Sequence, residues 1–161
     1  MAGMFEGVVI SMGADHAGFE LKEYLKKFLV GEGAEVIDFG TDSSARVDYP
    51  WFCAHAAQAV RDKKARFGIV VGGSGQGEQI SANKVHGIRA ALCQDEYTAR
   101  LARAHNDANV IALGARVVPP EYAEEILKVF LSASFEGGRH LARLAQIAEI
   151  EVSEAKRALE S

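Results

Sequence analysis

Short apolar runs rich in β-branched residues alternate along this chain with segments whose apolar residues recur at helical spacing. The runs predict five strands, at 8–10, 34–37, 67–71, 88–92 and 108–113. The segments that follow them predict helices at 17–31, 50–62, 77–84, 95–105 and 120–134. Strands that alternate with helices form a parallel sheet with helices on both faces. We therefore expect a three-layer, doubly wound, Rossmann-like α/β fold.

A further helix is expected at the end of the chain, over 138–161, where the sequence becomes increasingly charged. No repeat, low-complexity tract or linker interrupts the 161 residues, and 48% of them are hydrophobic, enough for a full core without disulfides. Residues 1–161 are therefore expected to form a single domain, with 152–161 flexible.

Charge and cysteine content narrow the function classes. The net charge of −4 argues against broad nucleic-acid binding, which needs a basic face, but leaves room for a local anion site. Cys53 and Cys93 have no metal-like spacing and are expected to be buried thiols. No signal peptide and no apolar run long enough for a membrane span is present, so we expect a cytoplasmic protein.

The carboxyl ends of parallel strands are where open α/β sheets bind ligands, so the residues after each strand are the first candidates. After the first strand come Asp15 and His16, a pair suited to proton transfer or anion binding. Asp15 could instead cap the next helix, although that would leave His16 unexplained.

After the third strand comes the glycine-rich sequence GGSGQGE, residues 72–78. Its backbone N–H groups could converge on an oxyanion, but the sequence lacks the Gly-Lys-Ser/Thr ending of a P-loop and the GxGxxG spacing of a dinucleotide site. Glu78 follows the glycines directly. A carboxylate beside such donors is suited to removing a proton next to a carbonyl, whereas the alternative is an acid that favours the start of a helix.

Further polar candidates lie towards the C-terminus. His105 and Asn106 come between the fourth helix and the fifth strand, Arg116 follows that strand, and Arg139 and Arg143 share one helix face four residues apart. Two aligned guanidinium groups suit a phosphate, although surface arginines are usually solvated.

From Gly7 to Ile150 the sequence resembles the ribose-5-phosphate isomerases of type B, in the ribose/galactose isomerase family. The resemblance rests on motifs in order: GADHAGFELK at 13–22, VIDFGT at 36–41, DYP at 48–50, GGSGQGEQISANK at 72–84, GIRAALC at 87–93, HNDANVIALGARVV at 105–118 and EGGRHLAR at 136–143.

The resemblance implies an enzyme that interconverts an aldose phosphate and a ketose phosphate. No cofactor or metal is expected, because backbone dipoles can stabilise the charge. His105 would open the sugar ring, with Asp15 nearby, and His16 with the three arginines would hold the phosphate. Family members are homodimers or dimers of dimers whose active sites draw residues from two chains. The positions that match catalytic or substrate-binding residues are Asp15, His16, Tyr49, Gly73, Ser74, Gly75, Gln76, Gly77, Glu78, His105, Asn106, Arg116, Arg139 and Arg143.

One departure from many family members concerns the base. They carry a cysteine in a Cys-Gly-Thr-Gly sequence, and here that position is Gly72, while Ser74 replaces the threonine. A second branch has Gly-Gly-Ser-Gly followed by glutamate, as this chain does, so Glu78 is the expected base. Ribose 5-phosphate is the first substrate to consider. A six-carbon sugar phosphate such as allose or galactose 6-phosphate, or non-catalytic sugar-phosphate binding, are the alternatives.

Overall fold

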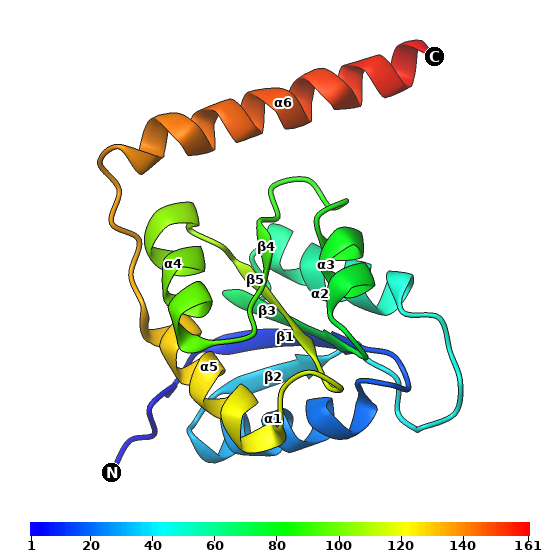
Figure 1. Ribbon diagram of the computed structural model, residues 1–161, viewed down its shortest axis with the longest axis vertical. Coiled ribbons are helices and arrows are strands. Elements are labelled where there is room, and N and C mark those ends of the chain that lie inside the picture. Colours follow the sequence, from blue (N-terminus) through cyan, green and yellow to red (C-terminus); the bar gives the residue numbers. More distant parts are fainter.

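The computed structural model describes residues 1–161 and confirms the predicted fold class. One parallel sheet has the strand order β2-β1-β3-β5-β4 (Figure 1). The strands are β1 (Val9–Ala14), β2 (Glu35–Asp38), β3 (Phe67–Gly72), β4 (Ala90–Leu92) and β5 (Val110–Gly114). The helices are α1 (Phe19–Gly31), α2 (Pro50–Arg61), α3 (Gln76–Ala82), α4 (Glu96–Asn106), α5 (Pro120–Ser132) and α6 (His140–Glu160).

Two apolar clusters hold the helices on the two faces of the sheet. The larger joins α1, α4 and α5 to one face, through side chains such as Leu25, Ile111 and Phe130. The smaller joins α2 and α3 to the other face and is built mainly from alanine and valine. The small side chains bring α2 and α3 close to the sheet, and both helices begin at its carboxyl edge.

The first strand is longer than its apolar pattern indicated. It was predicted over 8–10, but it runs to Ala14, and its last two residues pair with Val70 and Val71 of β3. Ser11, Gly13 and Ala14 carry little β signal of their own, and they are held in the ladder because β1 lies between two other strands. Because β1 extends to Ala14, Asp15 lies directly at the carboxyl edge of the sheet.

The direction in which successive strands are added to the sheet reverses between β1 and β3. From β1 it runs outwards to β2, and from β3 it builds the other side through β5 and β4. The loops after β1 and β3 therefore lie side by side at the topological switch point, where α/β sheets bind ligands.

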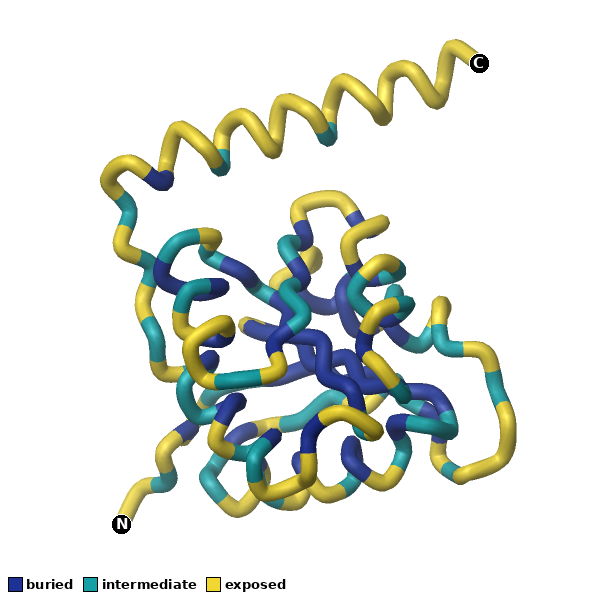
Figure 2. Tube along the Cα trace, viewed as in Figure 1, coloured by how far each residue is buried: buried dark blue, intermediate teal, exposed yellow.

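Helix α6 extends away from the rest of the chain (Figures 1 and 2). His140 is its only buried residue, and Glu151 accepts a hydrogen bond from the Gly87 backbone at 3.1 Å. The segment expected to be flexible is helical as far as Glu160, and its flexibility in solution stays a prediction. None of the helices combines the length and apolar character needed to cross a membrane.

Lys22 is a charged side chain inside the core, 1% exposed. Its ammonium donates to Asp38 at 2.6 Å and to Glu23 at 2.8 Å, and Lys26 also donates to Asp38 at 2.7 Å. Burial raises the pKa of Asp38, but these hydrogen bonds outweigh it and leave the pKa below its usual value. The network ties α1 to the end of β2.

We expect Asp38→Asn to lower the free energy of unfolding at neutral pH by about 2 kcal/mol, because charge-assisted bonds to buried Lys22 are weakened. The pKa of Asp38 is lower in the folded state, so its stabilisation is present above the unfolded value of about 3.9 and is lost as pH falls through the folded value. Urea titrations at neutral and acidic pH measure both effects. Asp62→Asn, at an exposed pair with Arg61, is the control and should change little. An Asp38→Asn effect of equal size at both pH values would contradict this account.

Candidate active site

The Glu78 carboxylate occupies the space beside the bare Cα of Gly72. Glu78 lies in the first turn of α3 and is only 4% exposed. A Cβ built on Gly72 would overlap both the carboxyl carbon and its oxygens. The glutamate therefore fills the position where any side chain at the end of β3 would begin, and the two positions constrain each other.

Asp15 is the second buried acid at this edge. Its Oδ1 accepts hydrogen bonds from the backbone N–H groups of Ala17 and Gly18, at 3.0 and 3.1 Å, and these order the turn into α1. Burial raises the pKa of Glu78, and the negative charge of Asp15 raises it further, against hydrogen bonds from backbone amides that lower it. A carboxylate with a raised pKa is a stronger base than an ordinary glutamate.

His16 and Tyr49 line the same edge from two different loops. The His16 Nδ1 lies 3.1 Å from the carbonyl oxygen and 3.2 Å from the amide nitrogen of Val47, and 4.0 Å from the Asp15 Oδ2. The phenol ring of Tyr49, at the start of α2, packs directly on the Cα of Gly77. The loop before α2 is thus fastened to both the Asp15 turn and the glycine-rich loop.

The glycine-rich loop is open to solvent at its tip and anchored underneath. Ser74 is exposed, and its hydroxyl accepts from the Gln76 backbone at 3.3 Å. Gly75, with φ of +80°, makes the left-handed turn that starts α3. The Arg116 backbone donates to the Gly73 carbonyl at 3.0 Å, and its guanidinium lies over Gly73.

A pocket of about 450 Å³ adjoins this loop, with His16 and Arg116 in its wall. It is lined by Glu20, Leu21 and Tyr24 of α1 and by the loop after β5. The cationic Arg116 and the histidine make its inner end suitable for an anion.

His105 and Asn106 lie elsewhere, at the amino edge of the sheet. They end α4, which runs antiparallel to the strands, and the Asn106 carbonyl accepts from Arg89 just before β4, at 2.8 Å. Arg139 and Arg143 lie nearby at the start of α6 and are exposed. We call these four residues the His105 group, and Asp15, His16, Tyr49, Gly73–Gly77, Glu78 and Arg116 the Glu78 group.

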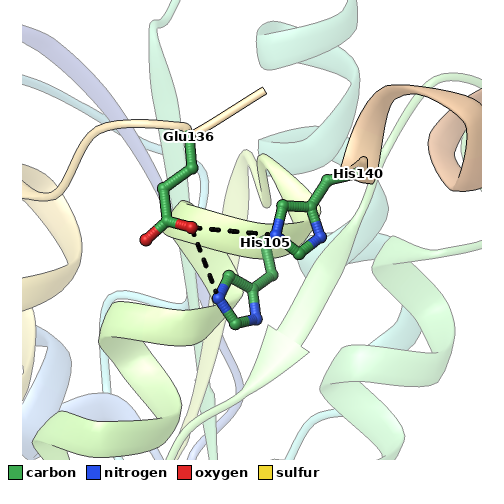
Figure 3. Close-up of side chains that lie close together, drawn as sticks. All are labelled: His105, Glu136 and His140. Carbon is green, nitrogen blue, oxygen red and sulfur yellow. Dashed lines mark ion pairs between the residues drawn. The ribbon is translucent and has the colours of Figure 1, made fainter. Parts of the chain in front are cut away.

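A pair of stacked histidines that was not predicted from the sequence links the end of α4 to the start of α6. The imidazole rings of His105 and His140 stack with centroids 4.3 Å apart, and each faces Glu136, at 3.6 and 3.7 Å (Figure 3). Burial lowers the pKa of His140, as do the charges of His105 and Arg139. The only signal in the sequence is the spacing of Glu136 and His140 within the EGGRHLAR motif.

One chain does not bring the two groups together. Strand β5 separates Asn106 from Arg116, and its five residues span about 16 Å at about 3.3 Å each. The packed core of the sheet lies between the two edges. The structure thus places all predicted site residues at one of two edges, and each edge alone holds an incomplete set.

Neither Cys53 nor Cys93 is suited to act as a thiolate base. Burial raises the pKa of Cys53, and the negative charges of Glu78 and Asp15 raise it further. Burial also raises the pKa of Cys93, to about 12. Both thiols are free and buried, as expected, and both are protonated at neutral pH.

Comparison with known proteins gives consistent relatives. The sequence model of the family described as Ribose/Galactose Isomerase matches residues 10–147. Ribose-5-phosphate isomerase B of Escherichia coli is 48% identical over 88% of this chain and 95% of its own length. A D-erythrulose-4-phosphate isomerase of Pectobacterium atrosepticum is 43% identical, over 90% and 96% respectively. The solved structure of Clostridium thermocellum ribose-5-phosphate isomerase B superposes with a TM-score of 0.90 at 48% identity, covering 91% of this chain and 99% of that one.

The contact between Gly72 and Glu78 predicts a strong coupling between the two positions. We expect Gly72→Ala to lower the free energy of unfolding by about 1–3 kcal/mol, because its methyl group overlaps the buried carboxylate. The same change in a Glu78→Ala background should be much less destabilising. Denaturant unfolding of the four proteins measures the coupling, with Gly31→Ala, which meets no atoms within 4 Å, as the control. Additive effects of the two substitutions would show that the side chains do not meet.

Proposed function

The chain belongs to the ribose/galactose isomerase family, and on that premise we propose that it interconverts D-ribose 5-phosphate and D-ribulose 5-phosphate. The observation that carries the proposal is the Glu78 carboxylate, buried beside Asp15 at the switch point and adjacent to the open glycine-rich loop. This is the pairing of base and oxyanion donors that isomerisation through an enediolate needs. The names of the relatives support the substrate.

The proposed reaction uses side chains and backbone amides alone. His105, with Asp15 nearby, opens the sugar ring, and the phosphate binds to Arg116, Arg139, Arg143 and His16. Glu78 removes the proton on C2, and the electrons of the C–H bond move to leave negative charge on O1 of the enediolate. The N–H groups of residues 73–77 and the Ser74 hydroxyl stabilise that oxygen. The proton on O2 then passes to O1, and as the C2–O2 carbonyl forms, the electrons of the C1–C2 double bond take the proton from Glu78 onto C1.

This scheme requires two copies of the chain, with the Glu78 group of one facing the His105 group of the other. The two groups lie at opposite edges of the sheet in a single copy, so one sugar phosphate cannot touch both. A two-fold dimer would bring them together twice and complete two identical sites. We therefore propose a homodimer, or a dimer of dimers, with shared active sites.

Helix α6 supports the dimer independently. Only one of its 21 residues is buried in the single chain, while apolar side chains on one helix face, such as Leu141, Val152 and Leu159, are about half exposed or more. An exposed apolar helix face of this length usually packs against another chain. Figure 2 shows the helix almost wholly exposed.

A cytoplasmic location is part of the proposal. The two cysteines are unpaired and buried, and the structure therefore needs no oxidising compartment.

We expect Glu78→Gln to reduce kcat by at least about 1,000-fold with little change in substrate affinity, because the amide cannot accept the proton. The variant should also be more stable than the wild type at neutral pH. The raised pKa of Glu78 means that ionisation opposes folding above that pKa, and the difference should vanish below the ordinary glutamate pKa of about 4.3.

A coupled assay of ribose 5-phosphate turnover and denaturant titrations at two pH values measure both effects. Parallel assays with D-erythrulose 4-phosphate and allose 6-phosphate define the preferred chain length. Glu35→Gln is the control, because Glu35 is exposed and its side chain makes no hydrogen bond or ion pair. Full turnover by Glu78→Gln would refute the assignment of the base.

Mixed oligomers test the shared site. Glu78→Gln and His105→Asn chains should each be inactive alone, because every site lacks one essential group. When the two variants are refolded together in equal amounts, half of the dimers contain one chain of each kind. One of the two sites in each mixed dimer is intact, so about a quarter of wild-type activity should return. Activity no greater than the sum of the two separate variants would show that each site is built within one chain.

A further inference from the structure

Three separate segments bring His105, Glu136 and His140 to one point at the amino edge of the sheet. His105 ends α4, His140 begins α6, and Glu136 lies in the extended segment between α5 and α6. The Glu136 backbone donates to the Ala104 carbonyl at 2.9 Å, which fixes that segment against α4. The residues therefore approach each other through tertiary structure rather than through helical spacing alone.

The turn between Glu136 and His140 aims the second imidazole at the first. Gly137 and Gly138 have φ of +65° and +56°, a left-handed pair that turns the chain sharply back. The turn is closed by a hydrogen bond from the His140 backbone to the Gly137 carbonyl at 3.1 Å. It leaves the His140 ring buried and stacked on His105 (Figure 3).

We propose that the two Nε2 atoms and the Glu136 carboxylate form a site for a divalent transition metal such as Zn²⁺, and that occupancy inhibits the enzyme. The potential ligand atoms all lie within 4.8 Å of one another, and both Nε2 atoms face the same Glu136 oxygen. Tetrahedral Zn²⁺ with bonds of about 2.0–2.1 Å separates its ligands by about 3.4 Å. To reach that geometry both imidazoles must rotate out of their stacked arrangement, so that their ring planes converge on one ion, and the three atoms must close from within 4.8 Å to that spacing.

The chemistry of the site selects the kind of ion. Two imidazoles and one carboxylate are the ligand set of many zinc sites that keep an open position. Mg²⁺ and Ca²⁺ prefer several oxygen ligands. The site has only one carboxylate, which lies beside the cationic Arg139 and Arg143, so it provides too few oxygen ligands for these ions. We therefore expect Zn²⁺ or Co²⁺ to bind and Mg²⁺ not to bind.

The inhibitory part rests on the proposed function of His105. An Nε2 that coordinates a metal cannot exchange a proton, and the bound ion would hold the ring against His140. The metal-binding part stands apart from that function, because it depends only on the three ligands. The two parts can therefore fail separately.

The test uses the full-length protein after dialysis against EDTA. Titration with Co²⁺, followed by its visible absorption, should show one ion per chain with the spectrum of a nitrogen-ligated site, and Zn²⁺ should displace it. Glu136→Gln and His140→Gln should each weaken binding at least about 10-fold, since each removes a ligand. Glu136 is largely exposed, so its substitution does not threaten folding.

His86→Gln is the matched control, because His86 faces Glu151 at 3.3 Å in a pair without a second histidine, and it should leave Co²⁺ binding unchanged. Absence of the Co²⁺ spectrum, or undiminished binding by both ligand variants, would overturn the site. Zn²⁺ should inhibit ribose 5-phosphate turnover, and His140→Gln should raise the half-inhibitory concentration by the same factor as the Kd. Tight binding with unchanged turnover would overturn the inhibition, whereas binding by a protein with no isomerase activity would refute the proposed function alone.

Discussion

The site at the carboxyl edge depends on the contact between the Glu78 carboxylate and the bare Cα of Gly72. Glu78 can be buried beside β3 only because Gly72 has no side chain. Burial and the nearby Asp15 raise its pKa, which is the property that a base for proton transfer between carbons needs. A cysteine side chain at position 72 would take the same space, so a thiol at the end of β3 and the Glu78 carboxylate exclude each other.

The sheet topology imposes a second constraint, because it separates the proposed phosphate ligands and acid–base groups between two edges. Arg116 follows β5 at the carboxyl edge. His105 precedes β5, and the two arginines at the start of α6 come after α5, at the amino edge. In the proposed dimer, assembly of two chains would resolve the separation and also cover the exposed apolar face of α6. Catalysis and association are thus coupled in the proposed enzyme.

The sequence was sufficient to predict the fold class and the approximate positions of the five strands, because buried parallel strands and amphipathic helices have strong periodic signals. It was not sufficient where tertiary contacts decide the structure. Gly13 and Ala14 belong to β1 only because β3 pairs with them, and Lys22 lies in the core only because Asp38 and Glu23 reach it from other positions. The stack of His140 on His105 depends on a turn of two left-handed glycines, which no periodicity reveals.

In the proposed reaction, the raised-pKa carboxyl group of Glu78 takes the proton from C2. Two titrations of the wild-type protein test this step: the carbon-13 shift of the Glu78 carboxyl group, and the rate at which solvent deuterium enters the substrate. Exchange should appear with the same pKa as the carboxyl group, and this pKa should lie above the usual glutamate value. A Glu78 pKa at or below that value, or exchange that follows a different titration, would contradict it.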